Sequence, residues 1–263
     1  MSFKLNDLIW DRLQYGFAEA LDTTGTPLYV LTQLQEATIN VTAEAKDVLD
    51  KDGSLIKKIW KSKAGTLEAT NAMINTNIIA AASGLDPVFA SEEGKIKMPA
   101  IKTVKKGQKL VLKDFVTGTV RLNEFFGNGS LGEAFELAEE AAEKKFAVDE
   151  GGNLTLPTGE GVEQYIVRYD RDVSDGVMIQ NRIDKFPKAV RLILKGLYFD
   201  PCEKNTLKPG YIELPSFQVS PEVSIPIQTE ATLDYKGDLE IDYCGTEKVL
   251  YNMYLPNESE EDE

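Results

Sequence analysis

The alternation of apolar and polar residues is most informative between residues 53 and 85, where two strand-like runs precede a strongly apolar one. In both runs apolar residues are interleaved with small or polar ones, a period typical of strands with one buried face. The apolar residues of the first run (54–61) are Leu55, Ile56, Ile59 and Trp60, and the second run (64–70) contains Leu67. The pattern therefore predicts two half-buried β-strands.

The period changes to that of a helix over residues 72–83. Asn71 is a suitable N-cap residue, and Gly84 stands where a left-handed residue ends a helix. The apolar face consists of Ile74, Ile78 and Ala81 or Ala82, widened by Met73 and Ile79. A helix that is apolar nearly all round needs cover on two sides. We expect a sheet on one side and further protein, a neighbouring subunit among the options, on the other.

A second helix is predicted over residues 131–146. Ser130 and Glu133 have the spacing of a capping box, and Glu140 and Lys144 form a favourable i, i+4 pair. Its narrow apolar stripe is Leu131, Phe135, Ala138, Ala142 and Phe146. We expect an amphipathic, acidic surface helix within a candidate inserted lobe at residues 121–160.

The remaining pattern is mainly that of strands. Residues 8–20 have no clean period and are compatible with a strand or a short helix, and the lysine-rich residues 91–109 are expected to form a loop. Strands are expected at 28–31, 37–42, 110–115, 116–122, 165–169, 177–179, 190–198, 212–214, 217–219, 223–227, 231–235, 239–243 and 249–254. Short strands with Pro and Gly between them are typical of an antiparallel β-sandwich or barrel.

Composition narrows the range of functions. The chain of 263 residues has a net charge of −14, which disfavours nucleic-acid binding because phosphate recognition depends on basic side chains. Residues 258–263 are expected to form a disordered acidic tail. Cys202 and Cys244 lack metal-ligand spacing and are expected to be reduced thiols in a cytoplasmic protein, since no signal peptide or membrane span is evident.

Candidate chemistry is sparse. The chain has no histidine, which removes the commonest general base and most metal sites. The Gly-rich run 127–132 matches the letters of a dinucleotide-binding loop and precedes the predicted acidic helix, but its β-rich and acidic surroundings oppose a pyrophosphate. Asp50 to Gly53 resembles the start of a calcium loop but lacks the later ligands, so a hairpin turn is expected instead. We expect no catalytic residue, no cofactor and no metal.

Two segments resemble the tail tube proteins of tailed bacteriophages. The first is the block Gly-Ser-Leu-Ile-Lys-Lys-Ile-Trp-Lys-Ser-Lys-Ala-Gly-Thr-Leu-Glu-Ala-Thr-Asn at residues 53–71, followed by the apolar helix and Ser83-Gly84-Leu85-Asp86. The second runs from Tyr165 through Phe186-Pro187, Asp200-Pro201, Pro215 and Ser220-Pro221 to Leu233-Asp234-Tyr235. Residues 121–156 lie outside this resemblance.

The resemblance implies a single β-sandwich or barrel domain over residues 1–257, assembled into stacked six-fold rings around a channel for the genome. It implies as partners the chain itself, the tape-measure, tail terminator and baseplate proteins, and DNA that passes without specific binding, and it implies assembly in the host cytoplasm into the virion tail. Candidates for assembly or core packing are Trp60, Leu67, Met73, Ile74, Ile78 and Ile79.

Two other classes fit parts of the pattern. A capsid decoration or other head-associated β protein would share the acidic, β-rich character. A carbohydrate-binding sandwich would need exposed aromatic side chains, for which Tyr165, Tyr169 and Tyr198 are the candidates. Neither class accounts for the block at residues 53–85.

Overall fold

A computed structural model describes residues 7–201, 206–241 and 248–256. The described chain is mainly β with antiparallel sheets and one helix, which confirms the predicted fold class but not its second helix. Contacts divide the chain into two compact units, one of residues 1–86 with 179–263 and the other of residues 87–178. The cysteines Cys202 and Cys244 and the acidic tail at 258–263 lie outside the described residues.

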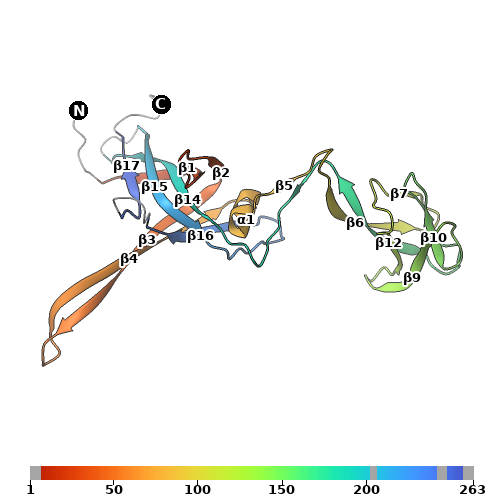
Figure 1. The fold of residues 1–263 in the computed structure, drawn as a ribbon, viewed down its shortest axis with the longest axis horizontal. Helices are drawn as coiled ribbons and strands as arrows, with labels where there is room; N and C mark the ends of the chain where they lie inside the picture. Colours follow the sequence, from red (N-terminus) through yellow and green to blue (C-terminus); the bar gives the residue numbers. More distant parts are fainter. Residues whose placement is uncertain (1–6, 202–205, 242–247, 257–263) are drawn as a thin grey trace. The chain divides into compact units, whose positions relative to one another are not determined.

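Unit 1 is built on a sheet with the strand order β2-β1-β14-β15-β16-β4-β3, to which β17 adds by pairing with β15 (Figure 1). Every pairing in it is antiparallel, and the sheet curls into a nearly closed barrel. The strands are β1 (Ile9–Ala20), β2 (Pro27–Leu31), β3 (Leu34–Leu49), β4 (Leu55–Asn71), β14 (Ala189–Phe199), β15 (Lys208–Val219), β16 (Leu233–Leu239) and β17 (Asn252–Tyr254). The two runs predicted at 54–61 and 64–70 are thus parts of one long strand.

The core of unit 1 lies on one face of this sheet. Its fully buried large side chains include Leu31, Leu67, Leu192, Phe217 and Tyr235. Helix α1 (Thr76–Ser83) adds Ile78 and Ala82 to the same core, as its apolar pattern predicts.

Helix α1 starts later than the sequence pattern indicates. Asn71 is the last residue of β4 and pairs with Leu34 and Leu233, so the N-cap is Asn75, whose side chain accepts a hydrogen bond from the backbone N–H of Asn77 at 2.8 Å. The predicted end is confirmed, because Gly84 is left-handed with φ of 70°. A Cβ at Gly84 would lie 2.2 Å from the Phe186 carbonyl oxygen, so glycine is needed there for space as well as for conformation.

Unit 2 contains a second sheet, with the order β6-β12-β8-β9-β10-β11-β7, and a separate pair of β5 with β13 (Figure 1). Its own core includes Leu122, Phe135, Phe146, Tyr165 and Tyr169. The strands are β5 (Val88–Phe89), β6 (Ile96–Lys105), β7 (Leu110–Val111), β8 (Arg121–Phe125), β9 (Leu131–Ala138), β10 (Lys145–Val148), β11 (Asn153–Thr155), β12 (Gln164–Val173) and β13 (Val177–Met178).

The prediction of a helix at residues 131–146 is wrong, because this range contains strands β9 and β10. Residues 126–130 form a hairpin turn, with Gly129 at φ of 88°, and β9 returns along β8 in antiparallel register. Phe135 and Phe146, expected on one helical stripe, reach the core from different strands, and Lys144 bonds Glu133 at 2.6 Å instead of Glu140. Tertiary pairing therefore overrides the high helix propensity of this alanine- and glutamate-rich segment.

Several boundaries also differ from the expected pattern. The lysine-rich segment expected as a loop contains the ten-residue strand β6, which pairs along its length with β12. Residues 8–20, whose pattern is ambiguous, are mostly strand β1, while residues 223–227 are not a strand. The candidate lobe at 121–160 lies wholly within unit 2, which extends further on both sides.

Candidate functional site

The outer halves of β3 and β4 leave the sheet of unit 1 together. The inner half of β4, from Gly65 to Asn71, pairs with β16, whereas residues 55–64 pair with β3 alone. Figure 1 shows the two strands projecting as an isolated pair. We call residues 42–64 the ribbon. All of its residues are exposed except the half-buried Val48.

Both faces of the ribbon carry large apolar side chains. Ile59 and Trp60 are consecutive residues in regular register with Lys46 and Ala45, so they lie on opposite faces. Leu55 and Ile56, at a register shift, are exposed as well; Ile56 is 66% exposed and Trp60 is 64% exposed. An isolated pair of strands is marginally stable in water, and large exposed apolar side chains on both of its faces are typical of an interaction surface. The ribbon therefore has the properties of an element that is covered by other protein.

The charges of the ribbon differ from those of the chain as a whole. Its β4 half carries Lys57, Lys58, Lys61 and Lys63 and no acidic residue, in a chain with a net charge of −14. The ammonium group of Lys58 lies 3.7 Å from the Asp47 carboxylate and 5.7 Å from the centre of the Trp60 ring. These contacts are exposed and contribute little stability.

The tip of the ribbon is the hairpin turn predicted from Asp50-Lys51-Asp52-Gly53. Asp50 Oδ1 accepts hydrogen bonds from the backbone N–H groups of Asp52 and Ser54, and Gly53 has φ of 84°. This carboxylate is occupied in closing the turn. In the described residues no cluster of acidic, histidine or cysteine side chains could hold a metal ion.

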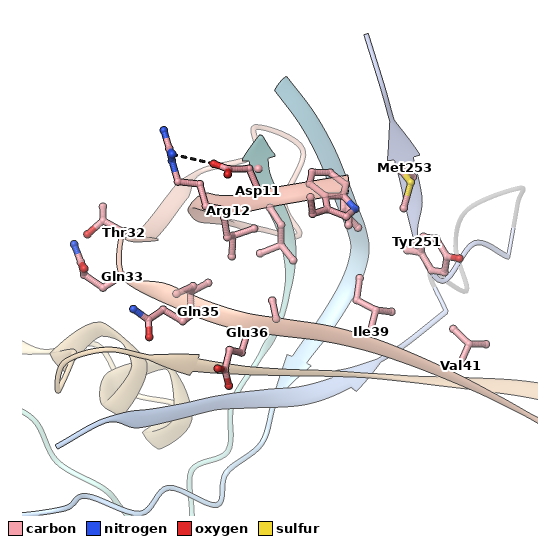
Figure 2. Close-up of a pocket in the computed structure, with 17 residues that line it drawn as sticks. Asp11, Arg12, Thr32, Gln33, Gln35, Glu36, Ile39, Val41, Tyr251 and Met253 are labelled. Atoms are coloured by element: carbon pink, nitrogen blue, oxygen red, sulfur yellow. Dashed lines mark hydrogen bonds and ion pairs between the residues drawn. The ribbon is translucent and has the colours of Figure 1, made fainter. Parts of the chain in front are cut away.

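A groove opens in unit 1 at the base of the ribbon, with a volume of about 810 Å³ (Figure 2). It lies between β3, at one end of the sheet order, and the part of β1 that the end strand β2 does not cover. Within the described residues no strand pairs with the free edge of β3, and β2 pairs with β1 only from Gly16 to Glu19. The apolar side chains that line the groove include Trp10, Leu13, Leu34, Ile39, Val41, Leu194, Ile212, Tyr251 and Met253.

Both strands that border the groove are irregular. The register of β1 shifts twice between Trp10 and Tyr15, and β3 has a bulge at which Glu36 adopts φ of 48°. Such bulges bend a strand and redirect its side chains. The charged side chains of the groove lining are Asp11, Arg12 and Glu36, and Arg12 donates a hydrogen bond to the Asp11 carboxylate at 2.9 Å (Figure 2).

Trp10 forms one wall of the groove because two glycines make room for its ring. A Cβ at Gly210 would lie 2.6 Å from the ring and one at Gly196 would lie 2.9 Å from it. The ring also packs edge-on against Tyr198, with centroids 5.9 Å apart. Substituting either glycine would displace the indole from this wall.

An ionic network connects β17 to β15, its partner strand. Glu213 of β15 accepts hydrogen bonds from Tyr254 at 2.7 Å and Asn252 at 3.2 Å, and Arg191 joins it to Glu19. Burial raises the pKa of Glu213, but the hydrogen bonds from Tyr254, Arg191 and Asn252 outweigh it and hold the pKa below its usual range. The ionised carboxylate thus fixes β17, which carries Met253 into the groove.

The predicted assembly or core candidates divide into two groups. Leu67 and Ile78 are buried in the core of unit 1, and Ile79 is half-buried against it. Trp60, Met73 and Ile74 are exposed, and Trp60 is the one that lies on the ribbon. The groove residues Trp10, Leu13 and Met253 were not anticipated. Residues 8–20 have no clean period, and the strand expected at 249–254 does not by itself indicate a groove.

Other expectations can be compared with the same structure. Tyr165, Tyr169 and Tyr198 are all buried, so the aromatic surface expected for a carbohydrate-binding sandwich is not formed by them. The glycine-rich run at 127–132 is a hairpin turn that leads into a strand and does not open a helix. In the described part of the chain, no helix has the length and apolar character needed to cross a membrane.

Comparison with known proteins gives the family. Among curated proteins no match was found. The sequence profile of the YomU/Tube protein family matches residues 18–241, most of the chain, in agreement with the resemblance to phage tail tube proteins. The matched range includes β3, β4, helix α1 and the whole of unit 2. The chain therefore belongs to the YomU/Tube protein family, and is a structural component of a phage tail tube.

Proposed function

We propose that this chain is the major tail tube subunit and that it self-assembles into stacked six-fold rings around a channel through which the genome passes. The ribbon carries this proposal. Its exposed Leu55, Ile56, Ile59 and Trp60 have no cover within the described chain, and repeated contacts between identical copies would provide that cover. The six-fold symmetry and the channel are what membership of a tail tube family leads us to expect.

The net charge of −14 suits a channel for DNA. An acidic wall repels phosphates, whereas a few basic contacts in every ring would hold the duplex. We propose that much of the excess Asp and Glu lines the channel. The partners proposed at the tube ends and inside it are the tail terminator, the baseplate proteins and the tape-measure protein, and DNA passes through without specific binding.

Negative-stain electron microscopy of the purified chain across a concentration series tests the proposal. We expect rings or hollow tubes of uniform diameter that become more frequent with concentration. Dispersed particles at every concentration would contradict self-assembly and favour a capsid decoration protein. In that case, binding to isolated phage heads would be the next measurement.

A further inference from the structure

We propose that the groove between β1 and β3 receives the ribbon of a second copy of this chain. The inference rests on the proposed self-assembly and adds to it a particular contact. It starts from two features of unit 1 in the described chain. The barrel has an open side, and the ribbon has no other part of the protein covering either face.

The groove offers what an inserted strand requires. The described strands leave unpaired the outer edge of β3 and the edge of β1 over residues 9–13, so backbone donors and acceptors border the opening. Apolar side chains lie beneath them, with Leu194 and Ile212 contributed by strands further into the sheet. Addition of a strand to open edges gives affinity through backbone hydrogen bonds, and the pockets for side chains give specificity.

The ribbon is suited to occupy such a site. Both of its strands have a free edge, and its two apolar faces need cover on both sides, which a groove provides and a flat surface does not. With six lysines and four acidic residues, the ribbon has a net charge of +2. The groove lining has a net charge of −1, from Asp11, Glu36 and Arg12, whose guanidinium lies 2.9 Å from the Asp11 carboxylate. Hydrophobic and electrostatic complementarity therefore favour the same occupant.

The contact is heterologous, because the tip of one copy meets the base of the next. Ile39 and Val41 line the groove and continue along β3 into the copy's own ribbon. Each copy that accepts a ribbon thus presents its own to a further copy. Repetition of this step gives a ring if the rotation closes and an open filament if it does not.

Two variants test the contact. Ile56→Asp places a charge on the ribbon, and Met253→Asp places one in the groove. Each variant alone is expected to lose association by about tenfold or more, as measured by analytical ultracentrifugation, because a charge then enters an apolar contact. Ile227→Asp is the matched control, since Ile227 is 97% exposed in unit 1 and lies in neither surface.

Mixing the two variants separates this contact from other modes of assembly. The Ile56→Asp copy keeps an intact groove and the Met253→Asp copy keeps an intact ribbon, so an equimolar mixture should form a 1:1 dimer and nothing larger. A mixture that stays monomeric would overturn the proposal, as expected if two ribbons contact each other or if another protein fills the groove.

The remaining outcomes also decide the question. If wild type and both variants assemble equally, the contact is refuted and the proposed function stands. If wild type stays monomeric throughout, both are refuted. Cooperative thermal unfolding of each variant is the check on folding, and Ala37→Arg, at an exposed groove position of β3, replaces Met253→Asp if that variant unfolds early.

Discussion

Ile74 and Ile78 are four residues apart and are expected on one buried helical face, yet their environments differ. Ile78 is 1% exposed within the core of unit 1, whereas Ile74 precedes the N-cap Asn75 and is exposed. The late start of helix α1 is the cause, because residues 72–75 link it to the end of β4. Burial at this point therefore follows the true helix boundary and not the apolar period.

This difference gives a paired prediction. Ile78→Ala should lower the free energy of unfolding by roughly 2–5 kcal/mol, because it removes buried methyl groups and leaves a cavity. Ile74→Ala should lower it by less than about 1 kcal/mol, since the side chain is already in contact with water. Chemical denaturation of both variants measures the difference, and equal losses would mean that the helix packs differently.

The hydroxyl groups of Tyr29 and Tyr235 form a second residue-level feature. They lie 3.0 Å apart in the core of unit 1, where the Tyr235 side chain is fully buried. Burial raises the pKa of Tyr29 to about 12, although the hydrogen bond with Tyr235 opposes the shift. Tyr29→Phe would leave the Tyr235 hydroxyl without this partner and should cost about 1–3 kcal/mol at neutral pH. Tyr15→Phe, at an exposed position, is the control.

The same pair predicts a loss of stability in alkali. Folding favours the protonated Tyr29, whose pKa of about 12 exceeds the unfolded value of 10.0, so this contribution is complete below pH 10 and is lost as the pH rises towards 12. The advantage of wild type over Tyr29→Phe in denaturation experiments should therefore narrow between pH 10 and 12. An advantage that stays constant across this range would show that Tyr29 titrates normally.

At the level of elements, the ribbon is separable from the fold. Thr42 and Ala64 are register partners just outside the part of β4 that pairs with β16. Replacing residues 43–63 by Asn-Gly should therefore close a short hairpin without disturbing the core. We expect this variant to unfold cooperatively like wild type and to form no rings or tubes in electron microscopy. Normal assembly without the ribbon would contradict its proposed role.

The elements also show what can be predicted from sequence. The alternation at 190–198 and 165–169 predicts β14 and β12 correctly, because each strand has one face in a core. The helix prediction at 131–146 fails because it follows local propensity, which favours a helix. The residues of β9 form a strand because they pair with β8, which precedes them across a turn. The sequence identifies Trp60 of the ribbon as a candidate residue. It does not identify the groove, because β1, β3, β14 and β17 come together only through the sheet order.

At the level of the whole molecule, the two units have separate cores and separate sheets. Both the ribbon and the groove belong to unit 1, whereas unit 2 is one continuous insertion of residues 87–178. The family match spans this insertion. Self-assembly and the role of the insertion are therefore open to independent tests.

Removal of unit 2 is the most direct of these tests. The insertion enters through β5 and leaves through β13, and Val88 pairs with Met178, so its two ends are neighbours. A short Gly-Ser linker between Asp86 and Ile179 should span the junction. Because the core of unit 1 draws on no residue of unit 2, the shortened chain should fold cooperatively and form rings or tubes with the same concentration dependence as wild type. A shortened chain that folds but stays monomeric would assign an essential part of the assembly surface to unit 2. The control is a chain that lacks both unit 2 and the ribbon, and it should stay monomeric because it no longer presents residues 43–63 to a neighbouring groove.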